Sequence, residues 1–194
     1  MTFSRSFKAT HPKPVWSFDR RALMPLRDNR FWQIEAGLVR TSTVLEDGTL
    51  ITFGLWGPGD TVGKTLAGVN PYQIECLSPV EALSLSFMEN QPLGKIVFSH
   101  LQQLQELTII RSYKRVETML AQLLGWLGQK FGREVVEGKL IELRLTHQDL
   151  GDILGITRVT VTRTLNQLEQ QGLIERLPLH QIILRESEVW YYQI

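Results

Sequence analysis

The sequence predicts an α+β protein in which a β-roll is followed by a long helical region and a winged helix. Three observations lead to this prediction. Short alternating stretches separated by glycine and proline turns fill residues 31–91. Apolar residues at helical spacing follow over residues 92–132. Residues 146–173 carry the capping and turn signals of two short helices, with two strand-like stretches after them.

Length and composition describe an ordinary globular protein. The 194 residues suffice for one large or two modest domains, and 43% of them are hydrophobic. Cys76 is the single cysteine, which excludes an intramolecular disulfide and, within one chain, an all-cysteine metal or cluster site. No apolar run approaches the roughly 18 residues of a membrane span, and the N-terminus lacks the apolar stretch of a secretory signal. We therefore expect a cytoplasmic protein with no membrane partner.

Charge is distributed unevenly around the net value of +1. Residues 1–30 hold seven basic and two acidic residues, and three prolines interrupt them. We interpret this segment as an arm that is ordered only where it docks and whose basic side chains are solvated, with contacts to DNA or to an acidic partner as the alternative. Residues 133–194 hold seven basic and nine acidic residues, which argues against nucleic-acid binding through bulk charge but not through one basic face.

The β-roll prediction for residues 31–91 depends on strands and on the turns between them. Asp47-Gly48 is a hairpin signal, and Pro58-Gly59 suits the centre of a type II turn. Residues 57–65 look like a phosphate loop, but Pro58 holds the place of its first glycine, so we do not expect nucleotide hydrolysis. Short strands at regular spacing are typical of a β-sandwich or roll. The predicted strands are residues 31–35, 38–45, 50–56, 72–77 and 81–87.

Residues 92–131 are predicted to be helical. Apolar residues in the second half of this region alternate steps of four and three, as in a coiled-coil seam. Ordinary core packing produces the same stripe, so the pattern alone leaves both a dimer interface and a core open. The residues concerned are Ile109, Tyr113, Val116, Leu120, Leu123 and Leu127.

Residues 146–173 are predicted to form two helices joined by a tight turn. Thr146 and Asp149 have the spacing of a capping box at the start of the first helix. Gly155 stands where the turn needs a residue that tolerates positive φ, and Thr157 can cap the second helix. Gly172 is a suitable residue to end that helix.

The two sides of the second helix differ in chemistry. Val161, Leu165 and Leu168 form an apolar side. The other side carries guanidinium, methyl, hydroxyl and amide groups, which read base edges and bind phosphates in a major groove, although a merely solvated polar face is the alternative. We expect DNA contacts from this side and its edges, by Thr146, His147, Arg158, Val159, Thr160, Thr162, Arg163, Asn166 and His180.

The remaining C-terminal segments complete a winged helix. A strand is expected over residues 139–145, and residues 173–176 and 181–184 flank a turn at residues 178–180. The histidines are too scattered for a metal cluster, and no nucleophile–base pair argues for an enzyme. We expect neither a metal nor a cofactor.

The chain after residue 30 resembles the CRP/FNR superfamily of bacterial transcription regulators. The resemblance rests on Glu-Asp-Gly at residues 46–48, Pro-Gly-Asp-x-x-Gly at residues 58–63, Met-Leu-Ala-x-Leu-Leu at residues 119–124 and the helix pair of residues 146–173. The resemblance implies an N-terminal jelly-roll β-barrel like a cyclic-nucleotide-binding domain at residues 31–91. It further implies a connecting and dimerisation helix at residues 92–132 and a winged helix-turn-helix DNA-binding domain at residues 133–194.

The resemblance also implies partners and reading residues. They are a second copy of the chain, RNA polymerase, and double-stranded DNA with a palindromic operator. The run from Thr157 to Arg163 is most similar to cyanobacterial NtcA-type regulators. The family's reading positions match Arg158, Val159 and Arg163, which implies a GTA…TAC palindrome. A ligand- or partner-binding signalling module without specific DNA recognition is the alternative, and the intact polar face argues against it.

The sensing residues depart from the family's pattern. Where cyclic-nucleotide binders have a glutamate and an arginine, this chain has Lys64 and Asn70-Pro71. Because this segment has no arginine to pair with a phosphate or carboxylate, neither cyclic AMP nor 2-oxoglutarate is the expected effector. A small anion held near Gly63 is one interpretation, and a simply solvated Lys64 is the other. Haem binding through Cys76 is opposed by its apolar neighbours, which favour packing. The candidate anion site consists of Val62, Gly63, Lys64 and Thr65, with help from Lys114 or Arg111.

Overall fold

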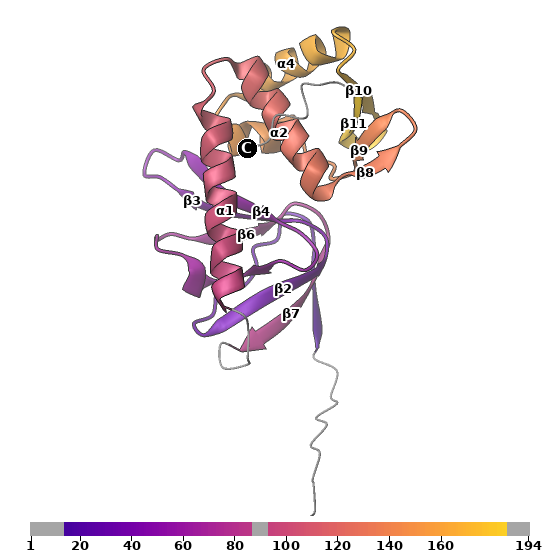
Figure 1. The fold of residues 1–194 in the computed structure, drawn as a ribbon. Helices are drawn as coiled ribbons and strands as arrows, with labels where there is room; N and C mark the ends of the chain where they lie inside the picture. Colours follow the sequence, from indigo (N-terminus) through magenta and orange to yellow (C-terminus); the bar gives the residue numbers. More distant parts are fainter. Residues whose placement is uncertain (1–13, 87–92, 186–194) are drawn as a thin grey trace, which may run out of the picture.

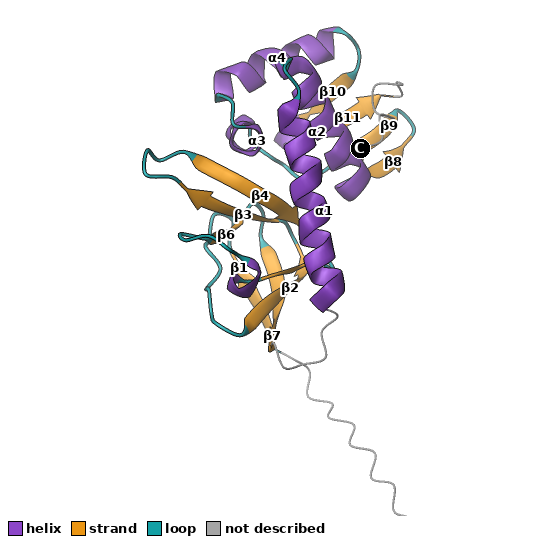
Figure 2. Cartoon of the chain, turned by 60° about the vertical axis from the view of Figure 1, so that its left-hand side comes forward, coloured by secondary structure: helices purple, strands orange, loops and turns teal. Residues whose placement is uncertain are grey.

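The computed structural model describes residues 14–86 and 93–185 (Figure 1). The expectations for residues 1–13, for the start of the helical region at Pro92 and for residues 186–194 lie outside the described residues. A β-rich half and a helix-rich half are stacked along one long helix, which runs beside both of them (Figures 1 and 2). In the described residues no helix is long and apolar enough to cross a membrane.

Two antiparallel sheets form the predicted β-roll. One sheet has the strand order β1-β7-β2-β5 and the other β4-β3-β6. Their inner faces enclose a core that includes Trp32, Ile34, Trp56 and Ile74. The strands are β1 (Val15–Phe18), β2 (Arg30–Ala36), β3 (Val39–Val44), β4 (Leu50–Trp56), β5 (Thr61–Val62), β6 (Gln73–Cys76) and β7 (Val80–Ser86).

Both turns predicted within the roll are present. Gly48 has a φ of 84° in the turn that joins β3 to β4. Gly59 has a φ of 88°, and the amide of Asp60 donates to the carbonyl of Gly57 across that turn. Both glycines adopt the left-handed conformation that these turns need. A short 3-10 helix, η1 (Lys64–Leu66), follows β5 in place of the helix of a phosphate loop.

The described part of the expected arm belongs to the roll. β1 pairs with β7 at its edge, and Leu23 forms a bridge to Glu75. Met24 is buried in the core of the roll. These contacts are distant in sequence, and the proline-rich composition of the segment carried no signal for them.

The helical region is confirmed, but it is two helices and not one. α1 (Leu93–Ser112) and α2 (Val116–Phe131) are separated at residues 113–115, where Arg115 has the extended φ of −91° and ψ of 122°. No glycine or proline marks this break. The expectation of one uninterrupted helix was therefore wrong, because tertiary packing turns the chain where local propensity does not.

The winged helix is present in the C-terminal part. α3 (His147–Leu154) and α4 (Arg158–Gln170) pack against α2, and their core includes Leu123, Ile153 and Leu165. A four-stranded sheet lies beside them in the order β10-β11-β9-β8. Its strands are β8 (Arg133–Val135), β9 (Gly138–Ile141), β10 (Ile174–Leu177) and β11 (Gln181–Arg185), with the 3-10 helix η2 (Pro178–His180) between the last two.

Candidate nucleic-acid interface

α3 begins and ends as its residues predict. The Thr146 hydroxyl accepts from the amide of Asp149 at 3.1 Å, and the Asp149 carboxylate accepts from the amide of Thr146 at 2.9 Å. This is the capping box, and it satisfies amides that the first turn leaves free. Gly155 ends α3 with a φ of 72°. A Cβ on Gly151 would lie 2.7 Å from the carbonyl of Ile156, so the turn that leads into α4 packs closely against α3 at this glycine.

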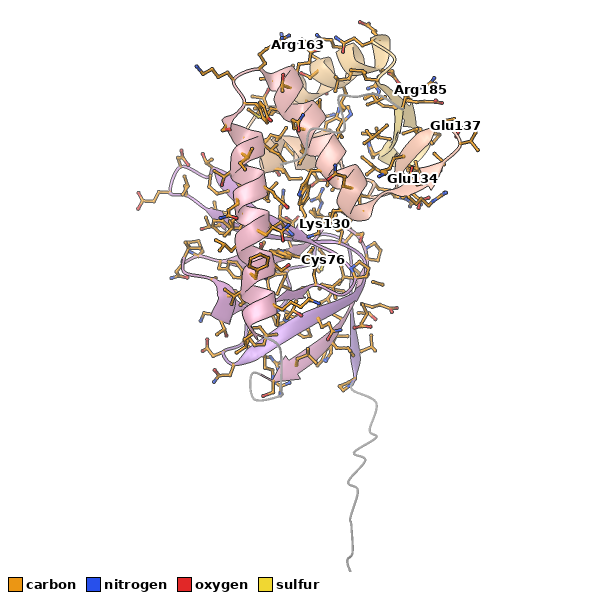
Figure 3. All side chains as sticks on the ribbon, in the orientation of Figure 1. Cys76, Lys130, Glu134, Glu137, Arg163 and Arg185 are labelled. Carbon is orange, nitrogen blue, oxygen red and sulfur yellow. The ribbon has the colours of Figure 1, made fainter. Side chains whose placement is uncertain are left out.

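α4 presents one side to the core and the other outward. Val161, Leu165 and Leu168 are buried, as their periodicity predicts. Val159 is 77% exposed, and the three long polar side chains on the same side are exposed too. Figure 3 shows Arg163 at the end of the molecule farthest from the roll. We call Arg158, Val159, Arg163 and Asn166 the reading face.

The three threonines expected among the DNA contacts are already engaged within the protein, Thr146 through the capping box and two in α4. The Thr160 hydroxyl bonds to that of Thr157 at 2.9 Å, within the N-cap of α4. The Thr162 hydroxyl donates to the carbonyl of Arg158 at 2.9 Å and lies 2.8 Å from Nδ1 of His147. Because that hydroxyl has one hydrogen, it accepts from Nδ1–H of His147. Thr162 therefore orients His147 beside the reading face.

A hollow lies between α4 and the wing. It has a volume of about 410 Å³, and His147, Arg176 and His180 are among its lining residues. The two imidazole rings lie 6.2 Å apart, edge to face. Burial, together with the nearby charges of His180, Arg176 and Arg158, lowers the pKa of His147. Arg176 is paired with Glu169 in this hollow, so the two imidazoles are the groups at the edge of the reading face that suit a phosphate contact.

The acidic residues of α3 point away from the reading face. Asp149 is 1% exposed and receives both guanidinium nitrogens of Arg21, at 2.7 and 3.0 Å. Asp152 receives Arg40 at 3.1 Å. Both arginines come from the roll, more than 100 residues earlier in the chain, and sequence patterns carry no signal for such pairs. Arg21 of the basic arm thus has its acidic partners within the same chain.

The predicted dimer seam splits between two environments. Leu120, Leu123 and Leu127 lie in the core of the winged helix, and Tyr113 packs against that core. Of the predicted set only Ile109 is among the exposed large apolar residues. The seam expected across Ile109–Leu127 is therefore corrected, because the break after α1 sends its second half into the protomer's own core.

A different apolar surface is exposed on α1. Three of its residues, Val97, Leu101 and Leu104, follow steps of four and three, which is the spacing of a coiled-coil seam. Continuing the predicted seam towards the N-terminus in its own register reaches Glu106, Gln102 and Ser99, so that pattern does not predict this surface. We call this surface, made of Val97, Phe98, Leu101, Leu104 and Ile109, the α1 stripe.

The candidate anion residues are only partly brought together. Val62 is buried, Gly63 packs against Phe31, and Lys64 pairs with Asp28 at 3.2 Å on the surface. His100 bonds to the carbonyl of Thr61 at 2.9 Å, which places β5 beside the first half of α1. Lys114 follows the far end of α1, about 18 Å of helix beyond His100. Lys64 and Lys114 therefore do not share a site.

The other proposed helper of the anion site is also committed elsewhere. Arg111 donates from Nε to the carbonyl of Ile153 at 2.7 Å and from another nitrogen to the carbonyl of Thr52 at 2.6 Å. Cys76 is fully buried, and burial raises the pKa of its thiol to about 11. The described residues hold no group of three or more side chains suited to a metal ion.

Comparison with known proteins finds a family model that matches the winged helix and relatives that match most of the chain. Residues 118–188 match the family model of the Crp-like helix-turn-helix domain. The chain is 41% identical to the Regulatory protein CysR of Synechococcus elongatus over 175 residues, 89% of this chain and 84% of the relative. It is 29% identical to the Global nitrogen regulator of a Synechocystis species over 191 residues, 89% of this chain and 85% of that one.

Solved structures share the fold over nearly the whole length. FixK2 from Bradyrhizobium japonicum has a TM-score of 0.80 at 20% identity and covers 93% of this chain and 96% of its own. A CRP/FNR-family regulator from Thermus thermophilus has a TM-score of 0.70 at 24% identity, with 92% and 96% covered. With its jelly roll, its helix-turn-helix and this level of identity to CysR, the chain belongs to the CRP/FNR family of DNA-binding transcription regulators.

Proposed function

We propose that this regulator reads a palindromic operator as a homodimer, through the reading face of α4. The observation that carries the proposal is the combination of two exposed guanidinium groups, an amide and a methyl-bearing side chain on one side of a helix. Its opposite side is fully buried, so the orientation of these groups is defined. Such groups on a recognition helix form bidentate contacts to guanine and adenine and apolar contacts to thymine.

The proposed half-site follows from which groups are available. Arg158 and Arg163 suit guanine, and Asn166 suits adenine. Val159 has no acceptor for the amino group of cytosine, but it offers a methyl surface to thymine. These features support a GTA…TAC palindrome like that of NtcA-type relatives.

The proposed dimer forms along the α1 stripe. Pairing α1 with its symmetry mate would bury Val97, Leu101 and Leu104 of both copies and relate the two reading faces by a two-fold axis. The reading helices would then meet successive major grooves about 34 Å apart. RNA polymerase is the further partner that we propose for the DNA-bound dimer.

The candidate anion site that we propose for an effector is limited to residues 62–65, without Lys114 or Arg111. A small anion there would have to replace Asp28 as the partner of Lys64. We retain residues 31–91, 92–132 and 133–194 as the sensing, connecting and DNA-binding units, with two changes. β1 and the residues before β2 join the sensing unit, and α2 joins the DNA-binding unit, whose core it shares. Adding candidate anions to an operator-binding titration tests the effector, and an unchanged affinity would favour an effector-free regulator.

Selection from a pool of random duplexes tests the proposed function. The full-length protein should enrich a palindrome with half-sites close to GTA and TAC. In a filter-binding titration it should prefer that duplex over a scrambled one as salt is raised, because specific contacts outlast phosphate contacts. Enrichment of no sequence would contradict the proposal and would favour a signalling module that acts without DNA recognition.

A further inference from the structure

A cluster of charged side chains ties the back of the helix-turn-helix to the roll, with Arg20 at its edge, 3.7 Å from Asp149. We call the five residues at its centre the interdomain latch. They are Arg21, Arg40, Glu75, Asp149 and Asp152. Arg40 and Glu75 are partners across β3 and β6, and their side chains pair at 2.5 Å. Arg40 also reaches Asp152 of α3 at 3.1 Å, and Arg21 reaches both Glu75 at 3.1 Å and Asp149 at 2.7 Å.

The latch is shielded from water at its centre. Arg40 is 3% exposed and Asp149 is 1% exposed. Burial alone would raise the pKa of the Asp149 carboxyl, but hydrogen bonds from Arg21 and Thr146 outweigh it and hold that pKa below its usual value. Buried, multiply bonded arginine–carboxylate contacts define an orientation more strictly than exposed ion pairs do.

Main-chain contacts reinforce the latch. Thr52 in β4 donates its hydroxyl to the carbonyl of Asp152 at 3.2 Å. Arg111 at the end of α1 bridges the carbonyls of Ile153 in α3 and Thr52 in β4. The roll, α1 and α3 therefore meet at one place.

A second anchor joins the two halves at another helix. Lys130, near the end of α2, lies 3.4 Å from Asp60 of the roll, and its ammonium lies 5.1 Å from the ring centre of Trp56 (Figure 3). Because the winged helix contacts the roll through both α3 and α2, it resists a rotation relative to the roll that a single contact would allow. α4 shares its core with α3, so its direction follows that of α3.

We propose that Arg40 and Arg21 are positioning residues that determine which half-site spacing the dimer accepts. α1 is fixed to the roll, where Gln103 accepts from the amide of Leu55 at 2.5 Å. If the dimer axis runs along α1, the latch sets the distance and angle between the two reading faces. The inference rests on the proposed palindromic operator. One extra base pair moves a half-site by about 3.4 Å and turns it by about 35°, which a rigid dimer cannot follow.

Spacing discrimination is the measurement that separates positioning from simple stabilisation. The probes are the duplex selected by the wild-type protein, versions with one base pair added or removed between the half-sites, and a duplex with one half-site. The variants are Asp152→Asn, Arg40→Gln, their double mutant and Arg21→Gln. Asp152→Asn keeps the shape of a partly exposed side chain, so it remains informative if Arg40→Gln fails to fold.

Arg133→Gln is the matched control. Arg133 donates two hydrogen bonds to Glu142 at 3.2 and 3.1 Å, but both residues are exposed and lie within the winged helix. This variant also loses an arginine–carboxylate pair, yet it should keep the wild-type preference for one spacing.

We expect latch variants to lose about tenfold of the discrimination between spacings, while affinity for the single half-site stays within about twofold. The double mutant should lose no more than Arg40→Gln alone, because both remove the same contact. Unchanged discrimination in Asp152→Asn and Arg21→Gln would overturn the inference, even if their melting temperatures fell. Failure of the wild-type protein to select any palindrome would instead overturn the proposed function.

Discussion

At the scale of single residues, the length of a polar side chain on α4 decides whether it bonds within the protein or extends into solvent. The short hydroxyls of Thr160 and Thr162 bond to nearby groups of the protein, whereas Arg158 and Arg163 reach into solvent. A threonine hydroxyl lies within reach of the carbonyl four residues earlier in the helix, and a guanidinium at the end of its stem does not. The arginines are therefore free to read DNA, and the threonines hold local geometry.

Replacing either arginine should weaken specific binding. We expect Arg158→Ala and Arg163→Ala each to cost about 1–3 kcal/mol of affinity for the selected duplex, because each removes a bidentate contact. Competition between the selected and a scrambled duplex measures the loss. Gln167→Ala, exposed on the same helix outside the reading face, should change discrimination little. Unaltered discrimination in both arginine variants would show that α4 is not the reading helix.

His147 should make operator binding depend on pH. The pKa of His147 is lowered by burial and by neighbouring positive charges, so its ring is neutral in the free protein near pH 7. A DNA phosphate would stabilise the imidazolium and raise that pKa, so binding takes up a proton. Affinity should therefore rise as pH falls from about 7.5 to about 6.

Titrations at several pH values with His147→Gln and His100→Gln test this dependence. His147→Gln should flatten the slope, and His100→Gln, altered in α1 beside the roll, should retain it. The free protein should respond in the opposite direction: because the folded pKa of His147 is depressed, its contribution to stability is lost as pH falls below about 6.5. An equal slope in both variants would assign the proton to another group.

At the scale of elements, two helices with similar spacing of apolar residues differ in whether those residues are buried. α1 and α2 both carry apolar residues at steps of three and four, but the α1 stripe is exposed and the α2 residues are buried. Helical periodicity shows that a helix has an apolar side, and it does not show what covers that side. Most strands were predictable from alternation and turn residues, whereas β1, β5 and β8 are too short or too irregular in pattern to predict.

The approach of α1 to β4 requires a glycine. A Cβ on Gly54 would lie 2.4 Å from the Gln103 side-chain oxygen and 2.5 Å from the ring of Trp56. We expect Gly54→Ala to lower the free energy of unfolding by about 1–3 kcal/mol, because a packed interface must shift. Urea denaturation measures this. Gly68→Ala, where a Cβ meets nothing within 4 Å, is the control, and equal losses in the two variants would contradict the packing argument.

At the scale of the whole molecule, α1 connects the proposed dimer, the roll and the helix-turn-helix. Its stripe faces outward, Leu107 and Ile110 are buried, and Arg111 bonds to both β4 and α3. A change in the roll can therefore reach α4 through one rigid element, as two-state regulators require. The roll and the helix-turn-helix contact each other directly where β4 meets α3.

Measuring the oligomeric state of variants tests whether the dimer interface is the α1 stripe or the buried residues of α2. The double variant Leu101→Glu with Leu104→Glu should sediment as a monomer and bind the palindrome no better than a single half-site, because charges disrupt an apolar seam. Leu123→Ala should stay dimeric but lose about 2–5 kcal/mol of stability through a core cavity. Sedimentation and urea denaturation of both variants measure this, and a dimeric double variant would place the interface elsewhere.

The sequence by itself determined those features that depend on neighbours along the chain. The capping box of Thr146 and Asp149, the left-handed Gly155 and the two-sided chemistry of α4 all follow from residues within one or two turns, and the family resemblance rests on the same runs. Only the tertiary structure decided the break after α1, the burial of Leu120–Leu127 and the pairing of Arg21 and Arg40 with α3. Those outcomes depend on which surfaces meet, and contacts between residues more than 100 positions apart leave no local pattern.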